Sequence, residues 1–254
     1  MPHIYNAPNL PAPKHAFFGR TGGVSKGIYN SLNFNYRGDD KPENLERNLD
    51  IAGAYYGLPG KRVVRLCQAH TSKAIYIDKP SQYEIDADAA VTDKTGIILG
   101  ITTADCIPVL LADFKSGIIG AAHAGWRGAL KGVIENTVKI MTERGAQLNN
   151  IAAATGPCLQ KNNFEVKDDM RNLFIEQSSQ NDRFFESIGG GKYLCDLEQY
   201  VKSRLELCGV NNVSLSNIDT YADEKHYFSY RRFCHRNLIL KPGAFGIELS
   251  TICL

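Results

Sequence analysis

The sequence predicts an α/β (α+β) fold, because short apolar runs alternate with longer segments of helical periodicity along the 254 residues. Hydrophobic residues make up 43% of the chain, enough to bury a sizeable core. No repeat, low-complexity tract or linker rich in Gly or Ser marks a boundary. We therefore expect one domain over residues 1–254.

Local patterns predict the elements in order. A helix is expected at 42–57, where apolar residues recur at helical spacing behind Pro42, a residue suited to the first turn. Apolar positions three and four residues apart predict a second helix over 126–143, with one buried face. Two more helices are expected at 168–177 and 197–208. Short apolar or alternating runs predict strands at 62–66, 73–77, 96–101 and 118–122.

Charge and composition argue against several classes of protein. Lys and Arg, 29 in number, exceed the 27 Asp and Glu too little for a general nucleic-acid or membrane-surface binder. The first 20 residues hold no continuous apolar run, and the most apolar stretch, 97–111, is shorter than the roughly 20 residues that span a bilayer. Seven cysteines without a CxxC pair fit no disulfide framework. We expect a cytoplasmic monomer that contacts neither nucleic acid nor membrane.

Two histidines and one cysteine form the strongest candidate site. His70 (LCQAHTSKA), Cys106 (GITTADCIPVLL) and His123 (GIIGAAHAGWRG) each lie near the end of an apolar segment, so their side chains can converge. Two imidazoles and a thiolate suit zinc, with the fourth tetrahedral position open to water or substrate. Such an ion lowers the pKa of its water to about 7. The same set also suits a Cys106 nucleophile activated by a histidine, and spacing leaves both interpretations open.

Motifs spread over nearly the whole chain resemble one family. They are FFGRTGGVSKGIYNSLNF at 17–34, QAH at 68–70, DADAAVT at 86–92, TTADCIPVLLAD at 102–113, AAHAGWRGALKGV at 121–133, ATGPCL at 154–159 and YFSYRR at 227–232. In this order they make the chain similar to the YfiH family. Its members were formerly called multicopper polyphenol oxidases or laccases and are now called purine nucleoside phosphorylases.

The resemblance implies mixed, stacked β-sheets flanked by helices, a YfiH-like sandwich, with zinc held by His70, Cys106 and His123. It also implies phosphorolysis of adenosine, inosine, guanosine and methylthioadenosine, and deamination of adenosine to inosine. Purine nucleoside and phosphate are then the expected partners. Copper is less favoured, because a multinuclear copper centre needs more ligands than six scattered histidines supply.

Phosphorolysis requires a cradle for phosphate, and arginines are the candidates. Arg20, in the glycine-rich segment 19–23, is the first choice for binding the anion, and Arg231 with Arg232 in FSYRR is the second. The alternative for each is a surface arginine, on a hairpin for Arg20 and on a strand for the FSYRR pair. Arg127 is expected to pack on Trp126.

The expected catalytic groups are Cys106, Asp105 and Arg20. Asp105 is expected either to transfer protons, as a carboxylate does in other zinc deaminases, or to orient a zinc-binding histidine. Gln68 is expected to contact the substrate together with Arg20 and Arg231. Asp88 is a weaker candidate for the site.

The chain departs from the family pattern at two places. Thr71 follows His70 where the family has glycine, and a β-branched residue resists a positive φ there. Asp219 and Thr220 stand where the family has a Cys-Thr pair, and a divergent tail follows FSYRR in place of TGR. Substrate contacts near these positions are expected to differ.

Three other functions fit the same residues. A cysteine hydrolase or amidase acting on peptidoglycan precursors would use Cys106 as nucleophile and His123 as base. A polyphenol oxidase would use copper. A binding protein would keep the zinc site without turnover.

Overall fold

The computed structural model describes residues 1–12, 14–80, 85–236 and 243–254, so part of the divergent tail, residues 237–242, lies outside the described residues. The helices are α1 (Pro42–Ala54), α2 (Trp126–Leu130), α3 (Val133–Glu143), α4 (Asp168–Gln177), α5 (Leu197–Leu207) and α6 (Tyr230–His235). The strands are β1 (Ile4–Tyr5), β2 (His15–Phe18), β3 (Val63–Val64), β4 (Ala74–Tyr76), β5 (Ala89–Thr92), β6 (Ile98–Thr103), β7 (Ile107–Asp113), β8 (Ile118–Ala124), β9 (Ala152–Thr155), β10 (Glu165–Lys167), β11 (Phe185–Gly189), β12 (Lys192–Cys195), β13 (Asn212–Ser214) and β14 (Glu248–Cys253).

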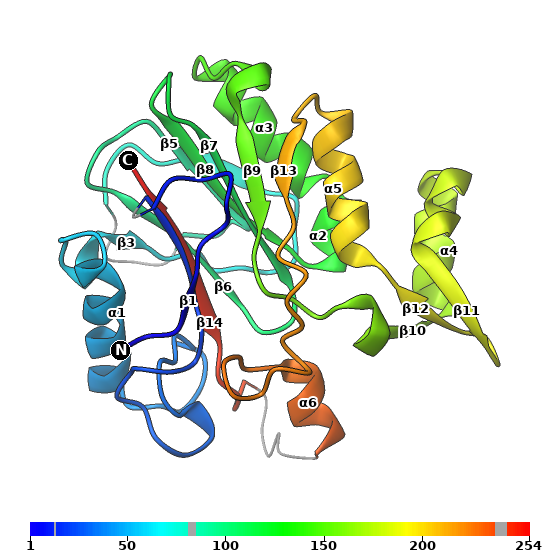
Figure 1. Cartoon of the computed structure of the whole chain (residues 1–254), viewed down its shortest axis with the longest axis horizontal. Coiled ribbons are helices and arrows are strands. Elements are labelled where there is room, and N and C mark those ends of the chain that lie inside the picture. Colours follow the sequence, from blue (N-terminus) through cyan, green and yellow to red (C-terminus); the bar gives the residue numbers. More distant parts are fainter. Residues whose placement is uncertain (13, 81–84, 237–242) are drawn as a thin grey trace.

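Two large mixed sheets form the centre of the molecule (Figure 1). One has the strand order β1-β2-β14-β6-β3 and the other the order β13-β9-β7-β8-β5-β4. Most neighbouring strands are antiparallel, whereas β3 with β6, β4 with β5 and β13 with β9 are parallel. The predicted mixed α/β architecture is confirmed.

The two sheets face each other across an apolar core, and helices cover their outer faces. Leu99 of β6 and Ile252 of β14 belong to the same buried cluster as Leu110 of β7. Because successive residues of a strand point to opposite faces, Val109 and Leu111 instead join the cluster that contains residues of α3. A third cluster lies between α1 and the five-stranded sheet. The layers are therefore α1, five-stranded sheet, six-stranded sheet, and the helices α2, α3 and α5 (Figure 1).

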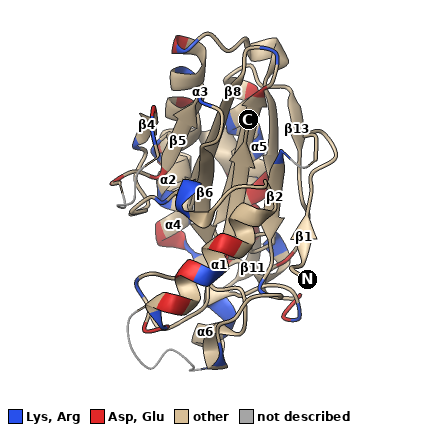
Figure 2. Ribbon diagram, turned by 90° about the vertical axis from the view of Figure 1, so that its left-hand side faces the viewer, with Lys and Arg blue, Asp and Glu red and all other residues tan. Residues whose placement is uncertain are grey.

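The rest of the molecule surrounds this sandwich. A small sheet of order β10-β12-β11 packs with α4 at one side (Figure 1). Charged residues lie mainly on helices and loops, whereas the strands of the sandwich are largely uncharged (Figure 2). Within the described residues, no helix combines the length and the apolar character that crossing a bilayer requires. The expectation of one domain over residues 1–254 stays a prediction.

The structure corrects two of the predicted elements. The single helix expected at 126–143 is divided into α2 and α3, because Gly132 between them has φ of +93° in the left-handed region. The FSYRR segment is not a strand but begins α6, where the Ser229 side chain caps the helix by accepting a hydrogen bond from Arg232 N. The predicted helices at 42–57, 168–177 and 197–208 and the four predicted strands are confirmed, with ends shifted by up to three residues.

Candidate metal centre

The β7–β8 hairpin carries two of the three candidate ligands. Cys106 directly precedes β7, and His123 is the penultimate residue of β8, in register with Pro108. In an antiparallel pair the start of one strand lies beside the end of its partner, so the thiol and the imidazole meet at the same end. Every residue of both strands is buried, which fixes the hairpin within the sandwich.

The third candidate ligand, His70, comes from the segment between β3 and β4. Its φ is +58°, in the left-handed region, and the buried Asp88 carboxylate holds the segment in place. That carboxylate accepts hydrogen bonds from His70 N (2.9 Å), Thr71 N (2.7 Å) and Thr71 Oγ1 (2.6 Å). The expectation that Thr71 would resist a positive φ at its own position is therefore wrong, because the residue with the positive φ is His70. Thr71 instead donates two hydrogen bonds to Asp88.

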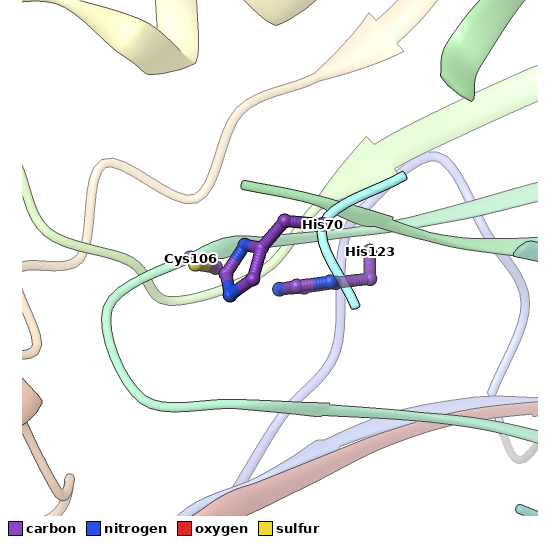
Figure 3. Close-up of side chains that lie close together, drawn as sticks. All are labelled: His70, Cys106 and His123. Carbon is purple, nitrogen blue, oxygen red and sulfur yellow. The ribbon is translucent and has the colours of Figure 1, made fainter. Parts of the chain in front are cut away.

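The ligand atoms of His70, Cys106 and His123 all lie within 4.8 Å of one another, and the three side chains point toward a common space (Figure 3). Tetrahedral ligands with bonds of about 2.0–2.3 Å to zinc lie about 3.3–3.8 Å apart, so small side-chain rotations suffice to bring them onto one ion. The glycine at position 125 leaves room for this approach. A Cβ on Gly125 would lie 2.5 Å from His70 Nδ1 and 3.1 Å from Cys106 Sγ. The donor set therefore fits one zinc ion.

Asp88 also fixes the orientation of the His123 ring. His123 Nδ1 lies 2.8 Å from Asp88 Oδ1, and His123 N donates to the Asp88 carbonyl oxygen at 2.7 Å. With Nδ1 on the carboxylate, Nε2 is the nitrogen left for a metal ion or a proton. Asp105 was one candidate for the carboxylate that orients a metal-binding histidine, and the structure shows that Asp88 makes this hydrogen bond to His123.

The buried thiol and imidazole shift each other's protonation. Burial disfavours the charged form of His123, but the Cys106 thiolate and Asp88 outweigh it and raise the His123 pKa to about 9. Burial likewise disfavours the thiolate, yet the charge of His123 and hydrogen bonds from both histidines lower the Cys106 pKa to about 6. The sulfur is therefore a thiolate at neutral pH, the form that binds metal or attacks an electrophile.

A cavity of about 870 Å³ adjoins the three side chains. This volume is in the range of small-molecule sites. Four arginines contribute to its wall: Arg37, Arg65, Arg127 and Arg231. In the part of the chain that the structure describes, Asp105 is the one carboxylate in the wall, and its oxygens accept hydrogen bonds from Thr220 Oγ1 at 2.7 Å and from Arg231 N at 2.6 Å. The cavity therefore favours an anionic ligand.

Arg20, the first choice for binding phosphate, does not contribute to the wall of this cavity. Its Nε donates to Asn30 O at 3.0 Å and its Nη1 to Glu224 O at 3.3 Å. Its Cζ lies 4.4 Å from the centroid of the Phe228 ring, and burial lowers the pKa of the guanidinium. A role of Arg20 in phosphate binding stays a prediction.

Gln68 and Asp105 lie in the wall of the cavity, but both are engaged with other parts of the chain. Gln68 Nε2 donates to Thr102 O at 2.7 Å, and Gln68 Oε1 accepts from Thr102 N and Oγ1. Asp105 has φ of +86° and joins the β6–β7 turn to the start of α6 through Arg231 N. Burial raises the pKa of this carboxyl.

The two arginines of FSYRR have different environments. Arg232 is buried, and its guanidinium donates to the carbonyl oxygens of Thr220 (2.6 Å) and Tyr221 (2.8 Å), so it ties α6 to the preceding loop. Arg231 lies in the wall of the cavity and donates to Glu165 O at 3.1 Å.

Three further arginines line the cavity, namely Arg37, Arg65 and Arg127. Arg127 packs on Trp126 as expected, with Cζ 4.2 Å from the ring centroid, and it also lines the cavity. Arg37 and Arg65 were not predicted. Their only signal in the sequence is that Arg65 lies five positions before His70.

Comparisons with known proteins agree with this fold. A family model described as multi-copper polyphenol oxidoreductase laccase matches residues 14–245. The purine nucleoside phosphorylase of Deinococcus radiodurans is 36% identical over 237 residues, which cover 90% of this chain and 87% of the relative. The purine nucleoside phosphorylase YfiH of Escherichia coli is 34% identical over 213 residues, covering 84% of this chain and 86% of the relative.

Solved structures are similar over almost the entire chain. The crystal structure of the Neisseria meningitidis protein NMB0706 has a TM-score of 0.88 and 34% identity, with 99% of this chain and 98% of that chain covered. YlmD from Geobacillus stearothermophilus, with a TM-score of 0.87 and 24% identity, shares the fold over 97% of this chain and 93% of its own.

Proposed function

The chain belongs to the YfiH family of multi-copper polyphenol oxidoreductase laccase proteins, and on this premise we propose that it is a zinc-dependent purine nucleoside phosphorylase that also deaminates adenosine. The observation that carries the proposal is the meeting of His70, Cys106 and His123 at the wall of an arginine-rich cavity. The names of the relatives supply the reaction class.

In this proposal His70, Cys106 and His123 hold the zinc ion, which supplies Lewis-acid chemistry when it is bound. Asp88 keeps the His123 ring in the orientation that presents Nε2. A multi-copper oxidase needs several groups of ligands. Among the residues that the structure describes, only this one group of three His, Cys, Asp or Glu side chains brings its ligand atoms together in this way. Zinc chemistry is therefore the better supported proposal.

The remaining side chains bind and orient the substrates. Phosphorolysis breaks the bond from the ribose C1′ to the purine and forms a bond from C1′ to a phosphate oxygen. Arg127 follows His123 in the chain, and the backbone N of Arg231 donates to Asp105, the residue before Cys106. Both arginines line the cavity, so we assign the inorganic phosphate to them. Trp126 and Phe164 also line the cavity and offer aromatic faces to the purine. Asp105 is the proposed proton-transferring group, while Arg20 and Gln68 shape the surrounding segments.

Turnover assays test the proposal. Zinc-loaded protein is expected to release adenine from adenosine only when phosphate is present, and to produce inosine without phosphate. Cys106→Ala removes the thiolate ligand and is expected to abolish both reactions. Cys208→Ala changes a half-buried cysteine at the end of α5 and is expected to keep both. The proposal is wrong if the zinc-loaded protein shows no turnover, or if Cys106→Ala is as active as the Cys208 variant.

The pairing of Cys106 with His123 favours one second candidate, a cysteine hydrolase or amidase. The lowered pKa of the thiol, about 6, and the raised pKa of His123, about 9, describe a thiolate–imidazolium pair in the absence of metal. For such an enzyme, iodoacetamide alkylates Cys106 equally with and without zinc, and activity survives a chelator. Protection of Cys106 by one equivalent of zinc contradicts this candidate.

A further inference from the structure

The cavity is larger than the proposed substrates require, and a second pair of aromatic residues lines it. Its volume of about 870 Å³ lies near the upper end of small-molecule sites, whereas a nucleoside with inorganic phosphate is a small ligand. Tyr230 and Phe245 belong to its wall in addition to Trp126 and Phe164. We propose that Tyr230 and Phe245 are a second base-binding subsite, which stacks the far base of a dinucleoside 5′,5′-diphosphate. The inference rests on the proposed function for the first nucleoside and extends it to a dinucleotide.

The two rings pack against each other and still keep accessible surface. The ring centroids of Tyr230 and Phe245 lie 5.0 Å apart, with an angle of 58° between the ring planes. Tyr230 is 46% exposed, and Phe245 is half-buried. Aromatic rings of this kind offer a face to a planar ligand, and every nucleobase has a π-face that can stack on them.

Hydrogen bonds hold the segment of Phe245 in place. The buried Asn35 side chain donates from Nδ2 to Gly243 O and to Phe245 O, both at 2.7 Å. One residue earlier, Phe34 N donates to Ile247 O at 3.1 Å. Because the Asn35 amide uses both of its N–H groups, the backbone at Phe245 is already ordered, and the stacking of a base loses little affinity to further ordering.

The start of α6 places Tyr230 close to the candidate metal centre. Arg231 N donates to Asp105 Oδ2 at 2.6 Å, and Asp105 directly precedes the candidate ligand Cys106. Standard bond lengths along this path limit the distance between the Cα atoms of Cys106 and Tyr230 to about 14 Å. A ligand bound at the metal centre can therefore extend to the aromatic pair.

Tyr230 and Arg231 face different parts of the cavity. Arg231 Cζ lies 5.6 Å from the centroid of the Phe164 ring, whereas Tyr230 meets Phe245. Successive residues of a helix are about 100° apart around its axis, so the first turn of α6 separates two aromatic groups in the wall. The first base is assigned to Phe164 and Trp126, and the second group is available to another ring.

The charge near the second subsite suits a bridge between two nucleosides. Arg37 lines the cavity, and its backbone N donates to Asn35 Oδ1 at 3.0 Å, beside the segment of Phe245. Its Nη2 donates to Cys67 Sγ at 3.1 Å, and the guanidinium fork has further N–H donors for phosphate oxygens. A pyrophosphate bridge is anionic and suits these donors. A bridge at the 5′ carbon also leaves C1′ open to attack.

Calorimetric titrations of zinc-loaded protein test this inference without turnover. Inosine, inosine diphosphate-ribose and diinosine 5′,5′-diphosphate are titrated separately in a buffer free of phosphate. Hypoxanthine has no amino group to remove, and phosphorolysis cannot proceed without phosphate. The last two ligands share the pyrophosphate bridge and the second ribose, so they differ only in the second base. The dinucleotide is expected to bind at least about fivefold more tightly than inosine diphosphate-ribose, as the stacking of one base on an aromatic side chain implies.

Variants locate the second base. Tyr230→Leu and Phe245→Leu each remove a ring but keep an apolar side chain, and both are expected to reduce the advantage to about twofold or less while the affinity for inosine stays within about twofold. Tyr230→Phe keeps the ring and is expected to keep the advantage. The matched control is Tyr193→Leu, at an aromatic residue of β12 that packs with Arg171, and it is expected to bind all three ligands like the wild type. Circular dichroism establishes that each variant is folded.

An advantage of about twofold or less in the wild type overturns the inference, because the two equivalent halves of the dinucleotide already produce that factor. An advantage that both leucine variants keep also overturns it. So does an equal loss of inosine binding in Tyr230→Leu, because the ring then belongs to the first subsite. A protein that keeps the dinucleotide advantage but shows no phosphorolysis refutes the proposed function and leaves this subsite standing.

Discussion

Replacement of Asp88 by asparagine tests how the candidate metal centre is built. The carboxylate is fully buried and accepts five hydrogen bonds, from the backbone of Ala69, His70 and Thr71, the Thr71 hydroxyl, and the His123 ring. Oδ1 serves His70 N and His123 Nδ1, while Oδ2 serves the other three donors. An amide has only one oxygen, so in either orientation its NH₂ group faces groups that also donate.

The size of the effect follows from these bonds. A hydrogen bond to a buried charged group contributes about 1.5–3 kcal/mol, and leaving a buried donor unpaired costs a similar amount. Loss of a partner that orients a metal-binding histidine lowers metal affinity about 10–100-fold, which is about 1.4–2.8 kcal/mol. We therefore expect Asp88→Asn to weaken zinc binding by one to two orders of magnitude and to lower the free energy of unfolding of the metal-free protein by about 1.5–3 kcal/mol.

Competition with a chromophoric chelator measures the zinc affinity, and urea unfolding measures the stability. The matched control is Asp113→Asn at the far end of β7. Asp113 is also fully buried and accepts hydrogen bonds from Lys115 N, Ser116 N and Gln147 N, at 3.0, 3.1 and 2.9 Å. The Asp113→Asn variant is expected to show a comparable decrease in the free energy of unfolding but to bind zinc with the affinity of the wild type. The reasoning is refuted if Asp88→Asn binds zinc within about twofold of the wild type, or if Asp113→Asn is weakened equally.

Three further predictions follow from the same structure. Gly125→Ala places a methyl group 2.5 Å from the present position of His70 Nδ1, so the exposed imidazole is expected to rotate away and the zinc content to fall, while the melting temperature of the metal-free protein stays unchanged; stoichiometric zinc in this variant contradicts the account. Burial raises the pKa of Glu248 well above its usual range. The neutral acid therefore contributes stability that is complete below the unfolded pKa of about 4.3 and is lost, by up to about 1.4 kcal/mol per pH unit, as pH rises toward the folded pKa. Glu248→Gln is expected to make the free energy of unfolding, measured with urea, depend less on pH in this range. A pH dependence parallel to that of the wild type would contradict this prediction. Finally, a chelator is expected to lower the melting temperature of the wild type but not of Cys106→Ala, because zinc stabilises only the folded state that assembles its ligands; equal responses of both proteins exclude Cys106 as a ligand.

The candidate ligands could be found from the sequence because each stands out in its surroundings. His70, Cys106 and His123 are polar or polarizable side chains in segments of small and apolar residues, and the structure brings their ligand atoms within 4.8 Å. The organising role of Asp88 could not be found in this way. It depends on contacts 18 and 35 residues apart in the chain, to His70 and His123, which local patterns do not encode.

The arginines show the same limit. Arg20 follows the pattern of an anion-binding loop, but its donors are directed to backbone carbonyl groups. Arg37 and Arg65 occur in unremarkable segments, and only the folded chain places them in one wall. Whether an arginine faces solvent or a cavity depends on packing between distant segments.

The fold was predictable where apolar periodicity is continuous and less so where a single residue interrupts it. The positive φ of Gly132 divides the helix predicted over 126–143, although the apolar spacing continues across the break. In FSYRR the aromatic residues suggest a strand, but the helix α6 has only six residues, too few for a clear helical period. The pairing of β14 with β2 joins segments from opposite ends of the chain, and no local pattern indicates it.

Anomalous diffraction at the zinc absorption edge, from crystals of the zinc-loaded protein, tests the central claim most directly. The account predicts one peak per chain, about 2.0–2.3 Å from Cys106 Sγ, from a ring nitrogen of His70 and from Nε2 of His123. No peak at this position in fully loaded protein, or a peak that contacts fewer than these three side chains, would contradict it.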